Sequence, residues 1–417
     1  MVQNHNRLLN IGKKRSSLCL CVADWICTRF ALIIVSILVA ISRMVKFLHR
    51  SKIDKKIVFV YANDLLGDTV VKLPFLFSLR EVFPQERYYI VVVLTPIMAS
   101  LVGKLSLIDE IIEEPTLHWR HPLFWLVGRN GIAKSLRWAF FNNAETMIVC
   151  HRSRSLGCDF ALRLCTPSTS VAYATDLETP MLPMTAILQA NSYDARYTHL
   201  LHAEKGRHQM EEMDILLRLA VGQPVQSRCV AEKDVVDMLD FSLATLTGPK
   251  YIALIPGARV NYRRWPVERF IEVASRLGEN VVVVGSDNET CLADEISRRT
   301  NCRVINLCGK TTLAQLGAVL SRASLVVSNE TGTANYAAVI GARTVCILGG
   351  GDFGAFFPNK HCPNVVSVFH RESCFNCGWR CSKGDLSKLG SAPCVMSVSV
   401  DDVMLAIDRI CVTKAKE

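Results

Sequence analysis

An aspartate stands where a predicted strand gives way to a predicted helix, and its carboxylate could act as a general base. The stretch Asn63–Pro74 has the sequence NDLLGDTVVKLP. It follows the apolar, β-branched run Lys56–Tyr61, which predicts a buried strand. Apolar residues then recur at helical spacing from Val70 to Leu79. Asp68 is therefore expected at the carboxyl end of a strand, where it can cap the helix or accept a proton from a bound hydroxyl group.

A second stretch, SNETGTANYAA (Ser328–Ala338), also follows a predicted strand and opens a predicted helix. Its turn of Thr331, Gly332 and Thr333 exposes backbone N–H groups at the positive end of the helix dipole, which suits a diphosphate. The alternative is that one of the polar residues before the helix, such as Glu330 or Thr331, only caps it.

Two further strand-to-helix loops can converge on the same ligand. The stretch Ile255–Phe270 has a basic cluster that includes Arg263, just before a Trp-Pro pair whose proline suits a first helical turn. The stretch VVGSDNETCLADEI places Glu289 near a helix start. All three loops follow strands of one predicted sheet, and ligands bind such sheets at the carboxyl ends of the strands.

Four of the 17 cysteines form a cluster with near metal-ligand spacing. The pattern Cys-x2-Cys-x3-Cys-x12-Cys is close to that of four-thiolate sites, and its members are Cys374, Cys377, Cys381 and Cys394. It predicts a structural metal, zinc in preference to iron. A disulfide pair and free structural thiols are the alternatives. The remaining cysteines are scattered singly, as small buried apolar residues are in a reducing compartment.

The body of the chain alternates predicted strands and helices in two successive runs, separated by the linker-like stretch VGQPVQS. This alternation predicts two doubly wound α/β domains with a ligand cleft between them. The expected division is a leader over 1–52, a first domain over 53–222 and a second domain over 223–417. Long helices are also expected over His199–Leu219 and around Pro122–Phe141.

The leader is basic and contains a short apolar run. Lysine and arginine outnumber acidic residues 48 to 38, and much of the excess lies in this segment, so the charge does not predict a nucleic-acid surface. The apolar run Phe30–Ile41 is shorter than the roughly 18–20 residues that span a bilayer. A signal peptide, a spanning anchor, an interfacial helix and a helix packed on the body are the alternatives. Positive charge just after the run favours membrane attachment with the body on the cytoplasmic side.

From about residue 56 to residue 411, the chain resembles glycosyltransferase family 9, the heptosyltransferase-like family. The matching stretches occur in the family's order and are LLGDTVVKLPFLFSLREVFP, PGARVNYRRWPVERFIEVASRL, NLCGKTTLAQLGAVLSRASLVVSNETGTANYAAVIGARTVCILG and VDDVMLAIDRI. The resemblance implies the GT-B fold, in which two Rossmann-like domains face a cleft. It also implies a nucleotide-diphosphate sugar donor and a lipid-linked or lipopolysaccharide-type acceptor at the cytoplasmic face of a bacterial inner membrane.

The resemblance implies roles for individual residues as well. The acid of the family's Gly-Asp turn is held to be the catalytic base, and Asp68 matches it. Arg263 matches the basic residue that contacts the diphosphate, and Glu289 matches the acid thought to hold the ribose. Glu330 matches the acid near the donor sugar, although the family usually has aspartate there, and Asn335 stands where histidine is usual. Some related protein heptosyltransferases carry a four-cysteine iron site.

The expected function is an inverting glycosyltransferase that moves a heptose or related sugar to a cell-envelope saccharide. No cofactor is expected for catalysis, because an arginine and helix-end amides can stabilise the leaving diphosphate without a metal. The alternative is a non-catalytic GT-B protein that binds a nucleotide sugar or organises envelope assembly. The residues Glu330 and Asn335 keep this alternative open, whereas the presence of Asp68, Arg263 and Glu289 argues against it. A GT-B sugar epimerase is a third reading, and the Gly-Asp turn speaks against it.

Overall fold

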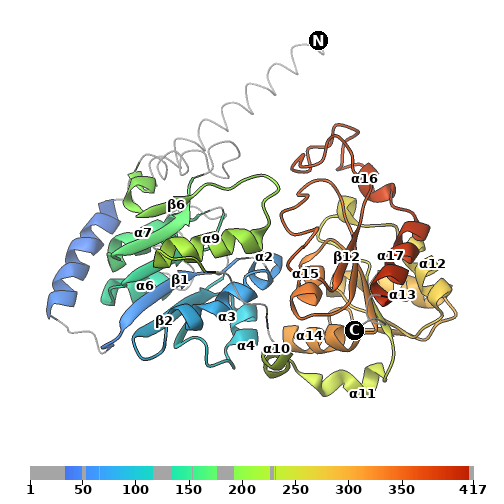
Figure 1. Cartoon of the computed structure of the whole chain (residues 1–417), viewed down its shortest axis with the longest axis horizontal. Helices are drawn as coiled ribbons and strands as arrows, with labels where there is room; N and C mark the ends of the chain where they lie inside the picture. The colour runs from blue at the N-terminus through green and yellow to red at the C-terminus, as the bar shows by residue number, and fades with distance from the viewer. Residues whose placement is uncertain are drawn as a thin grey trace, which may run out of the picture.

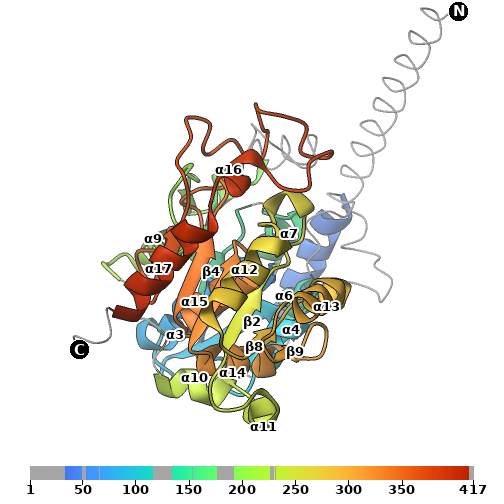
Figure 2. The same cartoon turned by 90° about the vertical axis from the view of Figure 1, so that its right-hand side faces the viewer.

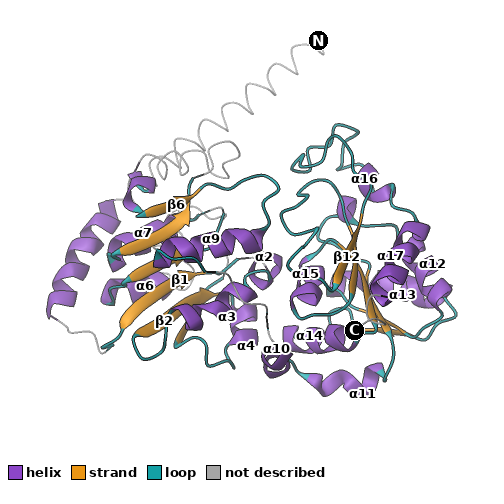
Figure 3. Ribbon diagram, in the orientation of Figure 1, coloured by secondary structure: helices purple, strands orange, loops and turns teal. Residues whose placement is uncertain are grey.

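The computed structural model describes residues 33–48, 53–64, 66–115, 134–152, 154–175, 192–225, 230 and 232–412. The start of the apolar run and most of the helix predicted around Pro122–Phe141 lie outside the described residues. The described chain forms two six-stranded sheets, and all strands within each sheet are parallel. Each sheet is covered by helices on both faces, and the two halves lie side by side (Figures 1 and 3). The expected fold, with two Rossmann-like domains facing a cleft and an N-terminal helix, is confirmed.

The first sheet is built from short β-branched runs that pair in the order β3-β2-β1-β4-β5-β6. The strands are β1 (Lys56–Tyr61), β2 (Tyr88–Leu94), β3 (Glu110–Glu113), β4 (Thr146–Val149), β5 (Thr169–Tyr173) and β6 (His199–Leu201). The helices that cover this sheet are α2 (Leu66–Val70), α3 (Leu73–Val82), α4 (Pro96–Val102), α6 (Lys134–Phe141), α7 (Leu156–Cys165) and α9 (Gln209–Val221), and a 3-10 turn, η1, spans Asp194–Arg196.

The second sheet repeats this arrangement, with the order β12-β11-β10-β7-β8-β9. Its strands are β7 (Ile252–Ile255), β8 (Val281–Val283), β9 (Val304–Asn306), β10 (Leu325–Asn329), β11 (Thr344–Ile347) and β12 (Val365–Val368). Its larger helices are α12 (Val267–Leu277), α13 (Thr290–Arg299), α14 (Leu313–Arg322), α15 (Gly332–Val339) and α17 (Val400–Val412). Shorter elements are α10 (Glu232–Met238), η2 (Phe241–Leu243), α11 (Ala244–Thr247), η3 (Asn261–Arg263), η4 (Asp287–Glu289) and α16 (Pro393–Met396).

In each sheet the strand order reverses beside the first strand of the half, between β1 and β4 and between β7 and β10. Loops leave the two strands at such a point toward opposite faces of the sheet, which opens a crevice where ligands bind. The loop after β1 carries Asp68, and the loops after β7 and β10 carry Arg263 and Glu330. The topology therefore explains why the residues predicted to be functional gather at the edges of the sheets that face one another.

The two halves share an apolar contact between their inner helices. Alternate residues of β1 enter different cores: Val58 and Val60 face the inner side, whereas Phe59 and Tyr61 face the outer side. The inner core continues from β1 through α3 and α4 into α14 and α15 of the second half. Figure 2 shows α12, α13 and α17 nearest to the viewer, on the face of the second sheet that is turned away from the first half.

The helix predicted over His199–Leu219 is wrong in its first half. Residues His199–Leu201 form β6, which pairs in parallel with β5, and the helix α9 begins only at Gln209. Gly206 has a φ of 81°, in the left-handed region, and the His208 side chain caps α9 by accepting from the Met210 N–H group. Strand pairing with β5, a long-range contact, has overridden a helical pattern in the local sequence.

Residues 33–48 form a helix that packs on the outer side of the first sheet. Val35 and Val39 are buried, Ser42 donates to the Phe140 carbonyl at 2.6 Å, and the Lys46 ammonium donates to two carbonyls of α6 and α7. Among the alternatives for the leader, the part that the structure describes is thus a helix packed on the body. No helix among the described residues is long and apolar enough to cross a bilayer.

Candidate functional site

A cleft of about 800 Å³ lies between the two halves and is lined by loops from both sheets. The residues predicted for the donor and for catalysis all line it: Asp68, Arg263, Glu289, Glu330, Thr331, Gly332, Thr333 and Asn335. These residues come from α2, η3, η4 and the turn from β10 into α15, and only the folding of both halves brings them to one surface. The cleft has the size of a site for a nucleotide sugar.

Asp68 lies in the first turn of α2, so the reading of it as an N-cap residue is wrong. The preceding Gly67 packs directly against the second half, because a Cβ atom on Gly67 would lie 3.0 Å from Gly332 Cα. The Gln209 side-chain amide lies 3.5 Å from Asp68 Oδ1. A side chain at position 67 would push apart the turn that carries Asp68 and the start of α15.

A buried ion pair supports the turn that carries Asp68. The Lys72 side chain is only 2% exposed and its ammonium pairs with Asp64 Oδ2. Thr69 Oγ1 donates to the Asp64 carbonyl at 3.0 Å, which closes the turn on itself. A buried ammonium is costly to leave unpaired, so the pair fixes Asp64 beneath the turn.

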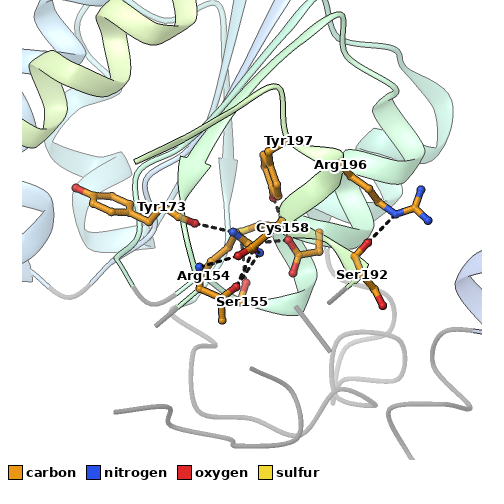
Figure 4. A network of polar contacts seen from close by, with 10 residues as sticks. Arg154, Ser155, Cys158, Tyr173, Ser192, Arg196 and Tyr197 are labelled. Carbon is orange, nitrogen blue, oxygen red and sulfur yellow. Dashed lines mark hydrogen bonds and ion pairs between the residues drawn. The ribbon is translucent and has the colours of Figure 1, made fainter. Parts of the chain in front are cut away.

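The neighbouring loop after β4 is held by a second network, centred on Arg154 (Figure 4). The Arg154 guanidinium contacts Asp159 Oδ1 at 2.8 Å and Asp194 Oδ1 at 2.5 Å, and it donates to the Tyr173 carbonyl at 2.6 Å. The Tyr197 hydroxyl donates to the same Asp159 oxygen at 3.0 Å. This network joins the carboxyl ends of β4 and β5 to η1.

In the second half, a buried asparagine ties the end of β10 to both ends of the loop between β7 and α12. Asn329, at the end of β10, donates to the carbonyls of Pro256 and Gly257 at 2.8 and 3.3 Å and accepts from the Trp265 N–H group at 2.8 Å. Because Pro256 and Trp265 lie on either side of η3, this residue fixes the loop that presents Arg263. The Arg263 guanidinium also pairs with Asp352 at 2.8 Å.

Glu289 caps a helix and lines the cleft at the same time. Its Oε2 atom accepts from the Ser286 N–H group at 2.7 Å and from the Ser286 hydroxyl at 2.9 Å, in a capping box. A Cβ atom on Gly257 would lie 1.8 Å from the Glu289 Oε1 atom, so the carboxylate lies directly over the backbone of the loop after β7. The second oxygen therefore faces the part of the cleft beside Gly257.

Glu330 and Asn335 place buried polar atoms at the cleft. Within the described residues, Glu330 Oε2 and Asn335 Oδ1 are buried and have no hydrogen-bond partner. Burial raises the pKa of Glu330 from 4.5 to about 8, although the nearby Arg263 guanidinium opposes the rise. Both groups can bind a ligand hydroxyl, and a protonated Glu330 can donate as well as accept.

The start of α15 presents its N–H groups to the same cleft. Thr331 is the N-cap residue, and its hydroxyl accepts from the Ala334 N–H group at 3.2 Å. The N–H groups of Gly332 and Thr333 have no partner within the helix, as is general for a first turn. Together with Arg263, they form a positively polarised edge suited to a diphosphate.

The four clustered cysteines surround a small cavity of about 20 Å³ on the second half. Within the described part of the chain, no three His, Cys, Asp or Glu side chains are arranged to hold a metal ion. The predicted four-thiolate site, formed by Cys374, Cys377, Cys381 and Cys394, is therefore not preformed in this structure. A structural zinc or iron ion stays a prediction.

Three residues near the site were not predicted from the sequence: Gln209, Asp352 and Trp379. Asp352 follows the run Gly349–Gly351 at the carboxyl end of β11. A run of glycines directly after a strand indicates that another group packs closely against the backbone there. This signal could have marked the loop that contains Asp352 as part of the site. Nothing local marks Gln209, because its proximity to Asp68 depends on the placement of α9 beside α2.

The chain has the fold and the interdomain cleft of GT-B proteins. Residues 189–384 match the family model "Glycosyltransferase family 9 (heptosyltransferase)", which confirms the resemblance over that region. A stretch of 109 residues is 30% identical to lipooligosaccharide heptosyltransferase 2 of Campylobacter jejuni. That match covers 24% of this chain and 34% of the relative, so it spans about a third of the curated protein.

Solved structures with the same fold cover almost the whole chain. A family 9 glycosyl transferase from Veillonella parvula has a TM-score of 0.61 at 18% identity, covering 88% of this chain and 100% of its own. The ADP-heptose LPS heptosyltransferase II of E. coli has a TM-score of 0.58 at 14% identity, covering 86% and 99%. The E. coli heptosyltransferase WaaC with ADP has a TM-score of 0.58 at 18% identity, covering 85% and 99%. At these identities, the structures establish the fold.

Proposed function

We propose that this protein is an inverting glycosyltransferase that moves a heptose or related sugar from a nucleotide-diphosphate donor to a lipid-linked or cell-envelope saccharide. The observation that carries the proposal is the contact between the turn of Gly67 and Asp68 and the start of α15 at Gly332. In this proposal, the Asp68 carboxylate of one half would lie next to an edge of the other half that binds the diphosphate, as a transfer across the cleft requires.

On the donor side, the diphosphate would lie against Arg263 and the N–H groups of Gly332 and Thr333. Glu289 would accept from the ribose hydroxyls, and Glu330 and Asn335 would bind the sugar through their unpartnered buried oxygens. The similar E. coli heptosyltransferase WaaC has been solved with ADP and with ADP-2-deoxy-2-fluoro heptose. A sugar-phosphate bond held in this way leaves the anomeric carbon directed toward Asp68.

The reaction would be a single displacement. An acceptor hydroxyl oxygen forms a bond to the anomeric carbon as the bond from that carbon to the diphosphate oxygen breaks, and Asp68 takes the hydroxyl proton. The electron pair leaves with the nucleoside diphosphate, whose charge is stabilised by Arg263 and the helix-end N–H groups. Attack opposite to the leaving group inverts the configuration of the sugar. In this scheme no metal or other cofactor takes part in catalysis.

We also propose attachment to the cytoplasmic face of a bacterial inner membrane, where such acceptors are made. One stripe of the helix over residues 33–48 is exposed and apolar: Ile33, Ile37, Ile41, Met44, Phe47 and Leu48. These residues recur at helical spacing opposite the buried Val35 and Val39, as in an interfacial helix. The basic residues of the leader would contact anionic lipid.

Measuring transfer by an Asp68→Asn variant tests the catalytic part of the proposal. Without its base, the variant should keep donor affinity within a few fold and lose roughly 10²–10⁴ in turnover. The matched control is Glu86→Gln, which changes an exposed carboxylate of the same half that does not line the cleft. Near-normal turnover in Asp68→Asn would remove Asp68 from the mechanism.

The same assay separates the alternative function. A wild-type protein that binds nucleotide sugars by calorimetry but transfers none of them to envelope saccharides would be a non-catalytic binding protein. Glu330→Asp and Asn335→His, alone and combined, restore the residues usual in the family. Activity that appears only in those variants would support the non-catalytic alternative.

A further inference from the structure

The diphosphate-binding arginine is held by groups from outside its own loop. Arg263 Nη2 donates to Asp352 Oδ2 at 2.8 Å, and the guanidinium carbon lies 4.4 Å from the centre of the Trp379 ring. The Trp379 indole N–H donates to the same Asp352 oxygen at 2.7 Å. The three side chains thus form a closed triangle that fixes both the plane and the direction of the guanidinium group.

Trp379 belongs to the cysteine-rich segment Cys374–Cys394, which is fastened to the loop after β11. Asn376 N donates to the Gly350 carbonyl at 2.7 Å, and Gly378 N donates to the Gly351 carbonyl at 2.9 Å. A Cβ atom on Gly351 would lie 2.1 Å from the Trp379 ring, so the ring lies directly on the glycine backbone. Trp379 itself has a φ of 60°, a left-handed conformation that a tryptophan adopts only when its surroundings hold it there.

The far end of the same segment contacts both neighbours of Arg263. Ala392 N donates to the Tyr262 carbonyl at 2.8 Å, and the Ser391 hydroxyl donates to the Arg264 carbonyl at 2.5 Å. The Tyr262 and Trp379 rings lie 5.2 Å apart. The cysteine-rich segment therefore contacts η3 and its neighbours in two ways: Ser391 and Ala392 form hydrogen bonds to backbone carbonyls, and the Trp379 ring packs against side chains.

We propose that Trp379 is a positioning residue for Arg263, which makes the cysteine-rich segment a part of the donor site. The proposal rests on the proposed function, in which Arg263 binds the diphosphate. An arginine binds a diphosphate through a planar fork whose orientation decides how many hydrogen bonds it forms. Stacking on Trp379 sets the plane of the fork, and the indole N–H orients the Asp352 carboxylate that holds one of its nitrogens. The Arg263 side chain remains 29% exposed, at the edge of the cleft.

The test measures binding of inorganic pyrophosphate, ADP and UDP to the full chain by calorimetry. Trp379→Phe keeps a ring but loses the N–H donor, and it should weaken binding about 3- to 5-fold, whereas Trp379→Ala should weaken it about 10-fold. In an Arg263→Ala background, Trp379→Phe should change the affinity by less than about 2-fold, because the group that it positions is gone. Leu389→Ala, in the same segment but with no hydrogen bond to η3 among the described residues, should leave the affinity unchanged.

The outcomes are distinguishable. If the effects of Trp379→Phe and Arg263→Ala are additive, or if Trp379→Phe binds as the wild type does, Trp379 does not position Arg263 and the proposal is overturned while the proposed function stands. If Trp379→Phe lowers only the melting temperature, the residue is structural and the proposal is also overturned. If none of the three probes binds the wild type, the proposed donor site fails, and this proposal fails with it.

Discussion

For single residues, the proposed donor site depends most on one guanidinium group, that of Arg263. Arg263→Ala should weaken nucleoside diphosphate and donor alike by ~1.5–3 kcal/mol, the range for a hydrogen bond to a charged group. Arg263→Lys should recover only part of this loss, because a point charge replaces a bidentate fork. Calorimetry with ADP and UDP measures both effects. Equal binding by the wild type and the alanine variant would show that the diphosphate lies elsewhere.

Glu330 should make stability depend on pH. Its pKa is raised by burial from 4.5 to about 8. The native state therefore holds a proton on this group that the unfolded state releases above pH 4.5. Stability from this group is consequently highest at low pH and falls by up to ~1.4 kcal/mol per pH unit as the pH rises through this range.

The neutral variant Glu330→Gln should lack this slope. Its free energy of unfolding, measured by urea denaturation, should exceed that of the wild type at pH 8, and the two should approach each other near pH 5. Glu268→Gln, which changes an exposed carboxylate, is the matched control. Parallel pH profiles of the wild type and Glu330→Gln would contradict the shifted pKa.

Among the elements, strand-to-helix turns carry most of the residues that we propose act on the substrate. The turn after β1 carries the candidate base, the loop after β7 carries Arg263, and the turn after β10 carries Glu330. Each turn is fixed by polar contacts that hold its backbone: the Asp64–Lys72 pair in the first half and Asn329 in the second. Because the backbone of such a turn is already ordered, ligand binding loses less conformational entropy than it would with a flexible loop.

The cysteine-rich segment permits an element-scale prediction about metal. If its four thiols coordinate one ion, protein purified under reducing conditions should carry about one zinc or iron per chain by elemental analysis. Cys377→Ser should then lose the ion and lower the melting temperature, whereas Cys291→Ser, at an exposed cysteine outside the segment, should change neither. Metal-free protein with an unchanged melting temperature would identify the thiols as structural only.

In the molecule as a whole, the helix over residues 33–48 is the part proposed to contact the membrane. The full chain should sediment with phosphatidylglycerol vesicles, because the exposed apolar stripe can enter the headgroup region while basic residues contact anionic lipid. Phe47→Ser, which removes the most exposed large apolar side chain of the stripe, should weaken the vesicle binding and leave the melting temperature unchanged.

The buried face of the same helix supplies the control. Val39→Ser should lower the melting temperature, because it places a hydroxyl in the core against α6 and α7, and it should leave the exposed stripe intact. If Phe47→Ser destabilises the fold as much as Val39→Ser does, the stripe is covered by protein rather than by lipid.

Local sequence patterns were enough to predict those parts of the structure that depend on neighbouring residues. The β-branched runs and the helical periodicity fixed the two α/β halves, and the turns at Asp68, Arg263 and Thr331–Thr333 were found because glycine, proline and capping residues act over a few positions. Repeated strand-helix units form parallel sheets, so the turns that follow the strands all lie at the carboxyl edge of their sheet.

Only the tertiary structure decided which groups meet. The approach of Gly67 to Gly332, the triangle of Arg263, Asp352 and Trp379, and the strand β6 in place of the start of a helix all join residues far apart in the chain. The same holds for the helix over residues 33–48. It has two apolar faces of similar composition, and only packing on α6 and α7 determines which of them is buried. Such contacts are set by how whole elements pack, and the free energy of that packing depends on partners that no local pattern identifies.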